Sequence, residues 1–339
     1  MTATVTPIGV ARRPERRLLM VEQLRGAANG HGAPFILDRH GHKMQGRDDE
    51  RRTAELREGL TRHEDVYATS ADARDEDVRR VLAALHSEEY LDALRRVDWE
   101  EPTMMPEWAP PGLPADSPVW AGAVSTAFEG VRTAITAAQR IIDGAQFTYA
   151  LCRPPGHHAG PAWLGGYCYL NTAAAAAYTL CEGGMKPVAI VDVDFHFPTG
   201  TSAIVSTLEN VKLCSLHAST LAEVPWRRVE AGEREIFVEF SSTPDRDVYI
   251  DTMSEVIEEV LPSSAALVLS LGYDIVANDP HGSWDFLNTI FLEMGEVLSS
   301  CERPICVVQE GGYSLDALAD CSHAFVAGLL MEDDDDGYE

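Results

Sequence analysis

The chain has 339 residues, 45% of them apolar and 24% charged, and its 54 acidic and 27 basic side chains give a formal net charge of −27. This composition is typical of a globular protein, and so negative a surface disfavours binding to nucleic acids and to anionic membranes. We therefore expect neither kind of partner. The charge would suit a cationic small molecule, and solubility alone explains it equally well.

The location and redox state of the chain are predicted from its apolar runs and cysteines. No run reaches the roughly 18 to 20 apolar residues needed to cross a bilayer, and the first 20 residues lack the hydrophobic core of a signal peptide. We therefore expect a cytoplasmic protein. The seven cysteines form no CxxC pair and lie mostly inside apolar runs, which predicts reduced thiols in the core.

The first 85 residues, rich in arginine, aspartate and glutamate, predict only two helices, over 48–63 and 75–96. Residues 101–118 hold six of the 19 prolines and predict an irregular loop. We expect one domain over 1–331, with 1–85 as a divergent N-terminal part. The acidic tail, 332–339, is expected to be disordered.

From about residue 118, apolar runs alternate with helical patterns, which predicts an α/β fold in one three-layer α/β/α domain with a mainly parallel central sheet. The predicted strands are 147–152, 188–193, 212–216, 265–271 and 305–309. The predicted helices are 119–142, 171–182, 247–261, 286–299 and 315–330. Residues 234–240 alternate polar and apolar, which predicts one further strand at an edge.

Four polar segments follow predicted strands, and ligands of such sheets bind outside the carboxyl ends of the strands. In the first, alternation along the extended chain puts Asp192, Asp194 and His196 on one side, where a carboxylate and an imidazole can converge on a cation. A helix-capping aspartate beside an incidental histidine is the alternative. In the second, Asp274 ends the run LVLSLGYD and would complete three protein ligands with an open position for water.

The third and fourth segments offer groups for proton transfer and for stabilising charge. His157 and His158 follow a Pro-Pro-Gly turn, and histidine moves protons near neutral pH. A chance pair on a surface loop is the alternative. Tyr313 ends the run EGGY, where glycines allow close approach to a pocket and a hydroxyl can donate to a developing oxyanion. A turn with a packing aromatic is the alternative.

Together these segments resemble the arginase/deacetylase superfamily, specifically histone deacetylase-like amidohydrolases, and most closely the acetylpolyamine amidohydrolases. The resemblance runs from about residue 86 to the C-terminus, while 1–85 match poorly. Its best stretches are CRPPGHHAG at 152–160, GGYCYLN at 165–171, VAIVDVDFH at 188–196, SLGYD at 270–274 and QEGGY at 309–313.

The resemblance implies a role for each matching residue and a deacetylase-like catalytic domain. A single Zn²⁺, or Fe²⁺ in some members, would be held by Asp194, His196 and Asp274. His158 would take the proton of the attacking water. The resemblance implies that His157 also handles protons and that Asp192 orients it. Asp192, with Ser215 near it, would help hold a structural K⁺. Tyr313 would act with the metal as an electrophile, Gly166 would lie beside the substrate amide, and Tyr167 would form a wall of the substrate channel.

The sequence departs from the family pattern behind the predicted metal ligands. Relatives continue DxDxH as HGNGT or HGDGT, whereas this chain has Phe197 and Thr199. A hydroxyl at Thr199 can accept from His158 but cannot stabilise an imidazolium as a carboxylate would, so His158 is expected to be less basic. The glycine-rich rim loop of relatives is replaced by 224–235, where Trp226 would line the mouth or pack at the surface.

Three hypotheses for function follow. The first is metal-dependent deacetylation of a small N-acylated amine, such as an acetylpolyamine or a biosynthetic intermediate, with Glu107 and Asp116 suiting a cationic substrate. The second is a divergent relative that binds metal and ligand with little or no turnover. The third is a protein-lysine deacetylase. Polyamine-branch relatives dimerise so that one subunit narrows the other's channel, and the unmatched segments would either form such a homodimer or simply pack.

Overall fold

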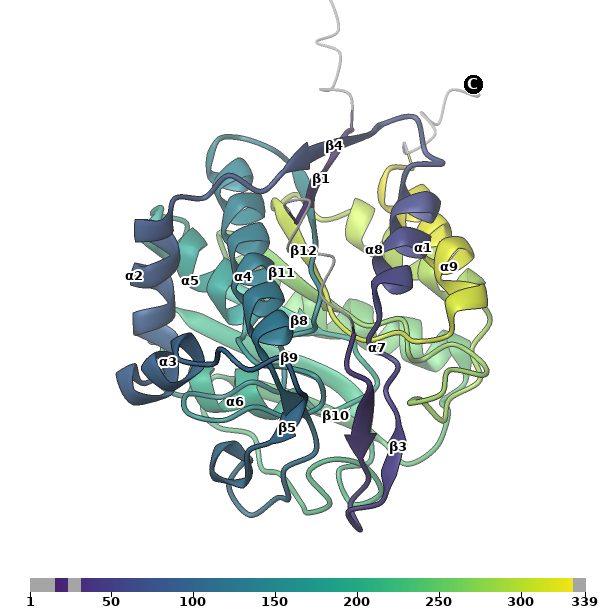
Figure 1. Cartoon of the computed structure of the whole chain (residues 1–339). Coiled ribbons are helices and arrows are strands. Elements are labelled where there is room, and N and C mark those ends of the chain that lie inside the picture. Colours follow the sequence, from purple (N-terminus) through teal and green to yellow (C-terminus); the bar gives the residue numbers. More distant parts are fainter. Residues whose placement is uncertain (1–15, 24–31, 332–339) are drawn as a thin grey trace, which may run out of the picture.

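An eight-stranded sheet in which every neighbouring pair is parallel forms the centre of the molecule (Figure 1). The computed structural model describes residues 16–23 and 32–331, so the predicted disorder of 332–339 lies outside the described residues. The strand order is β10-β9-β8-β11-β12-β7-β1-β4. The strands are β1 (Leu18–Glu22), β4 (Val66–Ser70), β7 (Phe147–Leu151), β8 (Val188–Asp192), β9 (Val211–Ala218), β10 (Glu235–Phe240), β11 (Ala266–Leu271) and β12 (Ile305–Gln309). The α/β prediction is confirmed.

Helices cover both faces of this sheet and produce three layers (Figure 1). One face carries α1 (Glu50–Leu60), α7 (Arg246–Val260), α8 (Thr289–Ser299) and α9 (Leu315–Leu329). The other carries α4 (Ala121–Ile142), α5 (Thr172–Glu182) and α6 (Thr199–Val205), with α2 (Asp75–Leu85) and α3 (Glu88–Arg95) packed on that side.

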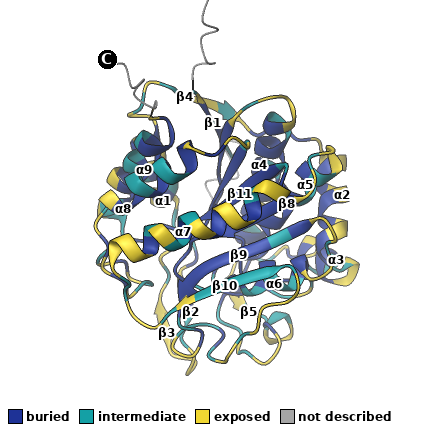
Figure 2. Ribbon diagram, turned by 180° about the vertical axis from the view of Figure 1, so that it is seen from behind, coloured by how far each residue is buried: buried dark blue, intermediate teal, exposed yellow. Residues whose placement is uncertain are grey.

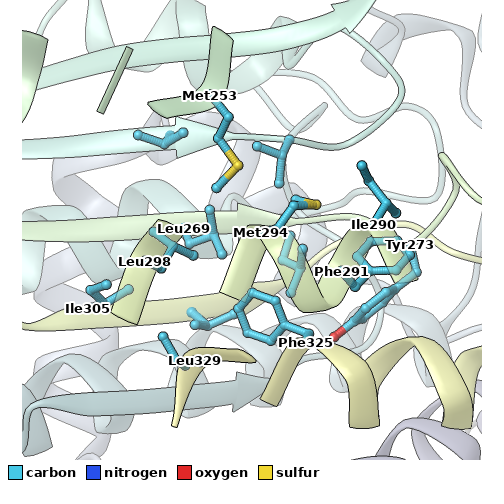
Figure 3. Packing of buried hydrophobic residues seen from close by; sticks show 14 of the residues in the cluster. Met253, Leu269, Tyr273, Ile290, Phe291, Met294, Leu298, Ile305, Phe325 and Leu329 are labelled. Atoms are coloured by element: carbon cyan, nitrogen blue, oxygen red, sulfur yellow. The ribbon is translucent and has the colours of Figure 1, made fainter. Parts of the chain in front are cut away.

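Most positions of the central strands are apolar because both faces of the sheet are buried. In β11, Leu267 and Leu269 join the core beneath α7, α8 and α9, whereas Val268 joins the core beneath α4 and α5. Figure 3 shows the first of these cores, where Leu269 packs among Met294 and neighbouring side chains. In Figure 2, β8 and β9 are mostly buried while β10 is mostly half-buried, as expected for an edge strand.

The predicted helix over 75–96 is wrong, because it is two helices that meet at His86. Burial and bonding explain the break: His86 Nδ1 lies 2.8 Å from the carbonyl oxygen of Gly160, and the backbone N–H of Asn171 donates to His86 Nε2 (3.2 Å). Ser87 then caps α3 by accepting from the backbone N–H of Tyr90. The break therefore ties this region to the loops that follow β7 and precede α5.

The N-terminal part contributes more than the two predicted helices. Strands β1 and β4 extend the central sheet, and β2 (Phe35–Leu37) pairs with β3 (Lys43–Gln45) in a hairpin. The predicted loop 101–118 is mainly irregular, but it includes a short helix, η1 (Pro106–Trp108), and β5 (Thr103–Met104), which pairs with β6 (Pro118–Val119). A second short helix, η2 (Leu261–Ser263), follows α7.

Two further predictions concern the cysteines and the membrane. All seven cysteines are free thiols, and six of them are buried. Within residues 16–23 and 32–331, every helix is too short or too polar to span a bilayer.

Candidate functional site

The four polar segments singled out in the sequence follow four strands that are neighbours in the sheet, β8, β11, β12 and β7. Asp194 and His196 come after β8, Asp274 after β11, Tyr313 after β12, and the His157–His158 pair after β7. Parallel strands end at the same edge of a sheet, so these side chains converge from distant parts of the chain.

Asp194, His196 and Asp274 form the candidate metal centre, since one ligand atom from each lies within 4.8 Å of the others. His196 Nδ1 is 3.4 Å from Asp194 Oδ1 and 3.3 Å from Asp274 Oδ2. Asp274 Oδ2 is fully buried and accepts no hydrogen bond from any described residue. A buried carboxylate oxygen without a donor is costly, so this set of two carboxylates and one imidazole fits a divalent cation such as Zn²⁺ or Fe²⁺.

Backbone amides and two glycines hold these carboxylates in place. The backbone N–H of Gly311 donates to Asp194 Oδ2 (2.9 Å), and that of Phe195 donates to Asp274 Oδ1 (3.0 Å). A Cβ at Gly311 would lie 2.6 Å from an oxygen of each carboxylate, and a Cβ at Gly272 would lie 2.3 Å from Asp194 Oδ2. Glycine is therefore required at both positions if the carboxylates are to stay this close.

His157 lies between two carboxylates. Its Nδ1 is 3.3 Å from Asp192 Oδ2, and its Nε2 is 3.6 Å from Asp194 Oδ1. Burial opposes charging of this imidazole, but the neighbouring Asp194 and Asp192 outweigh burial and raise the pKa of His157 to about 10. The two carboxylates therefore favour the protonated form of the His157 imidazole.

His158 has a neutral partner, because its Nδ1 lies 3.1 Å from Thr199 Oγ1. Burial first, and then the positive charges of His157 and His196, hold the pKa of His158 well below its usual range. Phe197 points elsewhere, packing against His217 with ring centroids 5.0 Å apart and against Phe237 at 4.9 Å. Both departures from the family sequence thus have defined places in the structure.

Tyr313 is buried, with 8% of its surface exposed, and burial keeps the pKa of its hydroxyl well above the usual value. Beneath it lies Arg52 of α1, which is 1% exposed and which no pattern in the sequence singles out. Arg52 donates to the carbonyls of Gly312 (2.7 Å) and Glu310 (2.6 Å), and its Cζ is 4.4 Å from the centre of the Tyr313 ring. Asp48 pairs with Arg52 at 2.6 Å.

The Gly166–Tyr167 segment forms one wall and has left-handed backbone at both residues, with φ of 54° and 67°. Asp116 and Ser117 hold it there. Asp116 accepts from the backbone N–H of Gly166 (3.0 Å), and Ser117 Oγ accepts from that of Tyr167 (2.8 Å). A Cβ at Gly166 would lie 2.3 Å from the His158 ring, so this approach requires glycine.

A cavity of about 450 Å³ opens over these residues. His157, His158, Asp194, His196 and Tyr313 line it on the side of the candidate metal centre. The rest of its lining comes from the β2–β3 hairpin, from Asp116, from Gly166 and Tyr167, from 222–226 including Trp226, and from Pro280 and His281. Of the two acidic residues expected to suit a cationic substrate, Asp116 therefore reaches the cavity, whereas Glu107 is not among the lining residues.

A second group with ligand spacing, His157, Cys168 and Glu310, is better explained as a structural tie. Glu310 is buried, and its Oε2 accepts from the backbone N–H groups of Gly156 (2.6 Å) and His157 (3.0 Å). Both ring nitrogens of His157 already face carboxylates. These contacts use the atoms that a second ion would need.

The predicted potassium ligands lie side by side, because Asp192 of β8 and Ser215 of β9 are register partners. Asp192 Oδ1 accepts from the backbone N–H of Asp194 (3.2 Å), and Ser215 Oγ lies 2.9 Å from His217 Nδ1. The K⁺ site stays a prediction.

The fold and this constellation define a deacetylase-like protein, and comparison with known sequences agrees. The chain belongs to the histone deacetylase domain family, whose domain matches residues 47–329. The match begins inside the N-terminal part, where the sequence alone shows little resemblance.

Named relatives place the chain near one branch of that family, as the sequence predicted. Acetylpolyamine amidohydrolase 1 of Pseudomonas aeruginosa is 32% identical over 212 residues, covering 60% of this chain and 61% of the relative. The acetylpolyamine amidohydrolase of Mycoplana ramosa is 33% identical over 211 residues, covering 59% and 62%. The chain thus matches about three fifths of the length of these relatives. The crystal structure of an acetylpolyamine aminohydrolase from Burkholderia pseudomallei aligns with a TM-score of 0.80 at 26% identity, covering 92% of this chain and 99% of that chain.

Proposed function

We propose that this protein is a metal-dependent amidohydrolase that removes the acyl group from a small N-acylated amine, with acetylpolyamines as the first substrates to test. The observation that carries the proposal is the convergence of Asp194, His196 and Asp274 beside a cavity that His158 and Tyr313 also line. The names of the relatives support the same reaction class.

The residues of the site divide the chemistry among them. A divalent ion held by Asp194, His196 and Asp274 would supply Lewis-acid polarisation of the amide carbonyl and activation of water. His158, whose Nδ1 faces Thr199, has Nε2 left to take the proton of the attacking water and to return it to the departing amine. Tyr313 keeps its proton at neutral pH and donates it in a hydrogen bond to the oxyanion that develops.

The cavity supports a small substrate. Its volume of about 450 Å³ accommodates an acylated diamine, and its lining includes Asp38, Asp116 and Glu223, which favour a cationic group at a distance from the amide. A protein-lysine deacetylase is the second candidate, favoured by the aromatic side chains of Tyr167 and Trp226 in the lining, which would pack against the methylene chain of an acetyl-lysine.

Turnover combined with metal analysis tests the proposal. The zinc-loaded chain is incubated with N-acetylputrescine and, separately, with a fluorogenic acetyl-lysine peptide, and release of free amine is followed. We expect release from N-acetylputrescine, and Tyr313→Phe should reduce kcat by about 10²-fold with metal content unchanged, as when one oxyanion donor is removed. Tyr178→Phe, a tyrosine outside the cavity lining, is the matched control.

Each other outcome selects an alternative. Release only from the acetyl-lysine peptide favours the protein-lysine deacetylase. Stoichiometric zinc with no release from either substrate favours a non-catalytic relative, in which Phe197 and Thr199 have removed the proton-transfer support. Full activity in Tyr313→Phe would contradict the proposed electrophile.

A further inference from the structure

Asp279 lies on the loop between β11 and α8, next to the candidate site but outside the predicted set of residues. Its side chain is buried, with 6% of the residue exposed. Its Oδ1 accepts from the backbone N–H groups of His281 (2.9 Å) and Gly282 (3.3 Å). Its Oδ2 accepts from those of Tyr313 (2.6 Å) and Ser314 (2.9 Å). One carboxylate therefore binds four amides from two separate loops.

The two loops carry the two rings that close one side of the cavity. The ring centroids of His281 and Tyr313 are 4.8 Å apart, and His281 Nε2 lies 2.9 Å from the hydroxyl of Tyr167. His281, Tyr313 and Tyr167 all line the cavity. Asp279 thus sets the position of the proposed electrophile relative to its neighbours in the cavity wall.

Tyr313 depends on such anchoring because of the glycines before it. Gly312 has a φ of 109°, and a chain through Gly311 and Gly312 has few intrinsic restraints on where the next residue points. Arg52 fixes the carbonyl side by donating to the Glu310 and Gly312 oxygens. Among the described residues, Asp279 is the acceptor for the amides of Tyr313 and Ser314, and bonds from amides to a carboxylate are stronger than neutral ones.

The same loop begins at the candidate metal centre. Asp274 lies five residues before Asp279, and the loop returns so closely that a Cβ at Gly282 would be 1.7 Å from the Asp274 carbonyl oxygen. Asp279 therefore links the segment that carries one proposed metal ligand with the segment that carries the hydroxyl donor. Small misplacement of a catalytic group reduces turnover strongly, so this link has a functional consequence.

We propose that Asp279 is a positioning residue that acts through Tyr313, holding its hydroxyl where the oxyanion forms. The proposal rests on the proposed function. A positioning residue differs from one that only stabilises the loop. Replacing a purely structural carboxylate would lower turnover by the same factor whether or not residue 313 carries a hydroxyl.

A double-mutant cycle tests this difference. The four proteins are the zinc-loaded wild type, Asp279→Asn, Tyr313→Phe and the double variant, assayed with the substrate that the wild type hydrolyses, and thermal melting verifies that each is folded. We expect Asp279→Asn to lower kcat by about 10-fold or more with KM changed less than about 3-fold. In the Tyr313→Phe background the same substitution should cost less than about 2-fold. Asp285→Asn, an exposed aspartate of the same loop, is the matched control and should leave kcat unchanged.

The outcomes separate the two proposals. Equal losses from Asp279→Asn in both backgrounds would show a structural role and overturn the positioning proposal alone. No loss from Tyr313→Phe would overturn the role of the Tyr313 hydroxyl, and the positioning proposal with it, while leaving the proposed function in place. No turnover by the wild type would instead overturn the proposed function. If Asp279→Asn does not fold, Asp279→Ser, which keeps one acceptor oxygen, replaces it in the cycle. If neither variant folds, Asp279 serves the fold and the positioning proposal is wrong.

Discussion

Thr199 is the residue that most clearly distinguishes this site from the family pattern, because it gives the proposed proton acceptor a neutral partner. Its hydroxyl lies 3.1 Å from His158 Nδ1, and burial together with the charges of His157 and His196 keeps the pKa of His158 low. A carboxylate at this position would stabilise the imidazolium form. The residue therefore sets how basic His158 can be.

Thr199→Asp tests this relation. The added negative charge should raise the pKa of His158, since an adjacent opposite charge commonly shifts a pKa by about one unit or more. If deprotonated His158 is required for turnover, the acidic limb of the kcat/KM profile will move to higher pH. Thr201→Asp would disturb a buried contact of Asn171, so Thr207→Asp, at an exposed threonine just after α6, is the control. An unchanged acidic limb in folded Thr199→Asp would exclude His158 as the group that titrates.

The sequence pattern predicts the site residues that directly follow apolar strands, but it does not predict the residues that support them from other segments. Asp194, His196, Asp274 and Tyr313 each end an apolar run, and that pattern brings them to one edge of the sheet. Arg52 carries no such signal, because an arginine four residues after an aspartate in a charged helix is typical of a surface ion pair. Asp279 and His281 do follow a predicted strand, so the segment NDPHG could have been included.

At the scale of elements, α1 supports the loop after β12, which carries Tyr313, through a buried ion pair. Arg52 and Asp48 are 1% and 5% exposed in their side chains, and their shortest contact is 2.6 Å. Arg153 also approaches Asp48, at 3.5 Å. Arg52 further bonds the carbonyls of Glu310 and Gly312, so α1 is linked directly to the loop after β12.

Removing Arg52 should therefore be costly in two ways. Arg52→Met leaves the Asp48 carboxylate without its closest partner and two buried carbonyls without donors, which should lower the free energy of unfolding by about 3 kcal/mol or more. Urea denaturation measures this loss. Arg51→Met is the control, because its partner Asp49 and Arg51 itself are 29% and 68% exposed, and it should change stability little. Similar midpoints for the two variants would contradict a supporting role for α1.

The junction of α2 and α3 should be sensitive to pH through His86. Burial lowers the pKa of His86 to about 4, whereas an unfolded imidazole titrates near 6.5. Because the unfolded chain binds the proton more readily, the contribution of neutral His86 is fully present above pH 6.5 and is lost as pH falls toward 4. The loss should be roughly 2 to 3 kcal/mol.

His86→Gln tests this contribution, since glutamine does not titrate. The variant should be less stable than the wild type at pH 7.5, and the difference in unfolding free energy should shrink as pH falls from 6.5 to 4. His63→Gln, a histidine outside this junction, serves as control. A difference that stays constant over this pH range would contradict the account.

Some boundaries of helices and strands can be predicted from the sequence and others cannot. The run 305–309 matches β12 residue for residue, because both faces of that strand are buried and its neighbours are polar or irregular. The break at His86 was missed, because the apolar spacing continues through it and the deciding bonds go to Gly160 and Asn171, which are distant in sequence. Local pattern cannot report contacts of that kind.

The whole molecule depends on its N-terminal part, although the sequence suggested little for it. Strands β1 and β4 complete the sheet beyond β7, α1 covers one face, and the turn of the β2–β3 hairpin lines the cavity. The apolar residues of β1 lie between Arg17 and Glu22 in a segment rich in charge, and β4 is a largely exposed edge strand, so neither stands out from the sequence as the central strands do. The order of the sheet and the shape of the cavity likewise required the structure.

The central claim for the whole molecule is that side chains from the loops after β8 and β11 hold one divalent ion. Zinc content per chain, measured by mass spectrometry after equilibration with a zinc buffer, tests it most directly. We predict one zinc per chain in the wild type and in the control Asp285→Asn, and far less in folded Asp274→Asn, which lacks one of the three ligands. A wild type without zinc, or Asp274→Asn with one zinc per chain, would contradict the account.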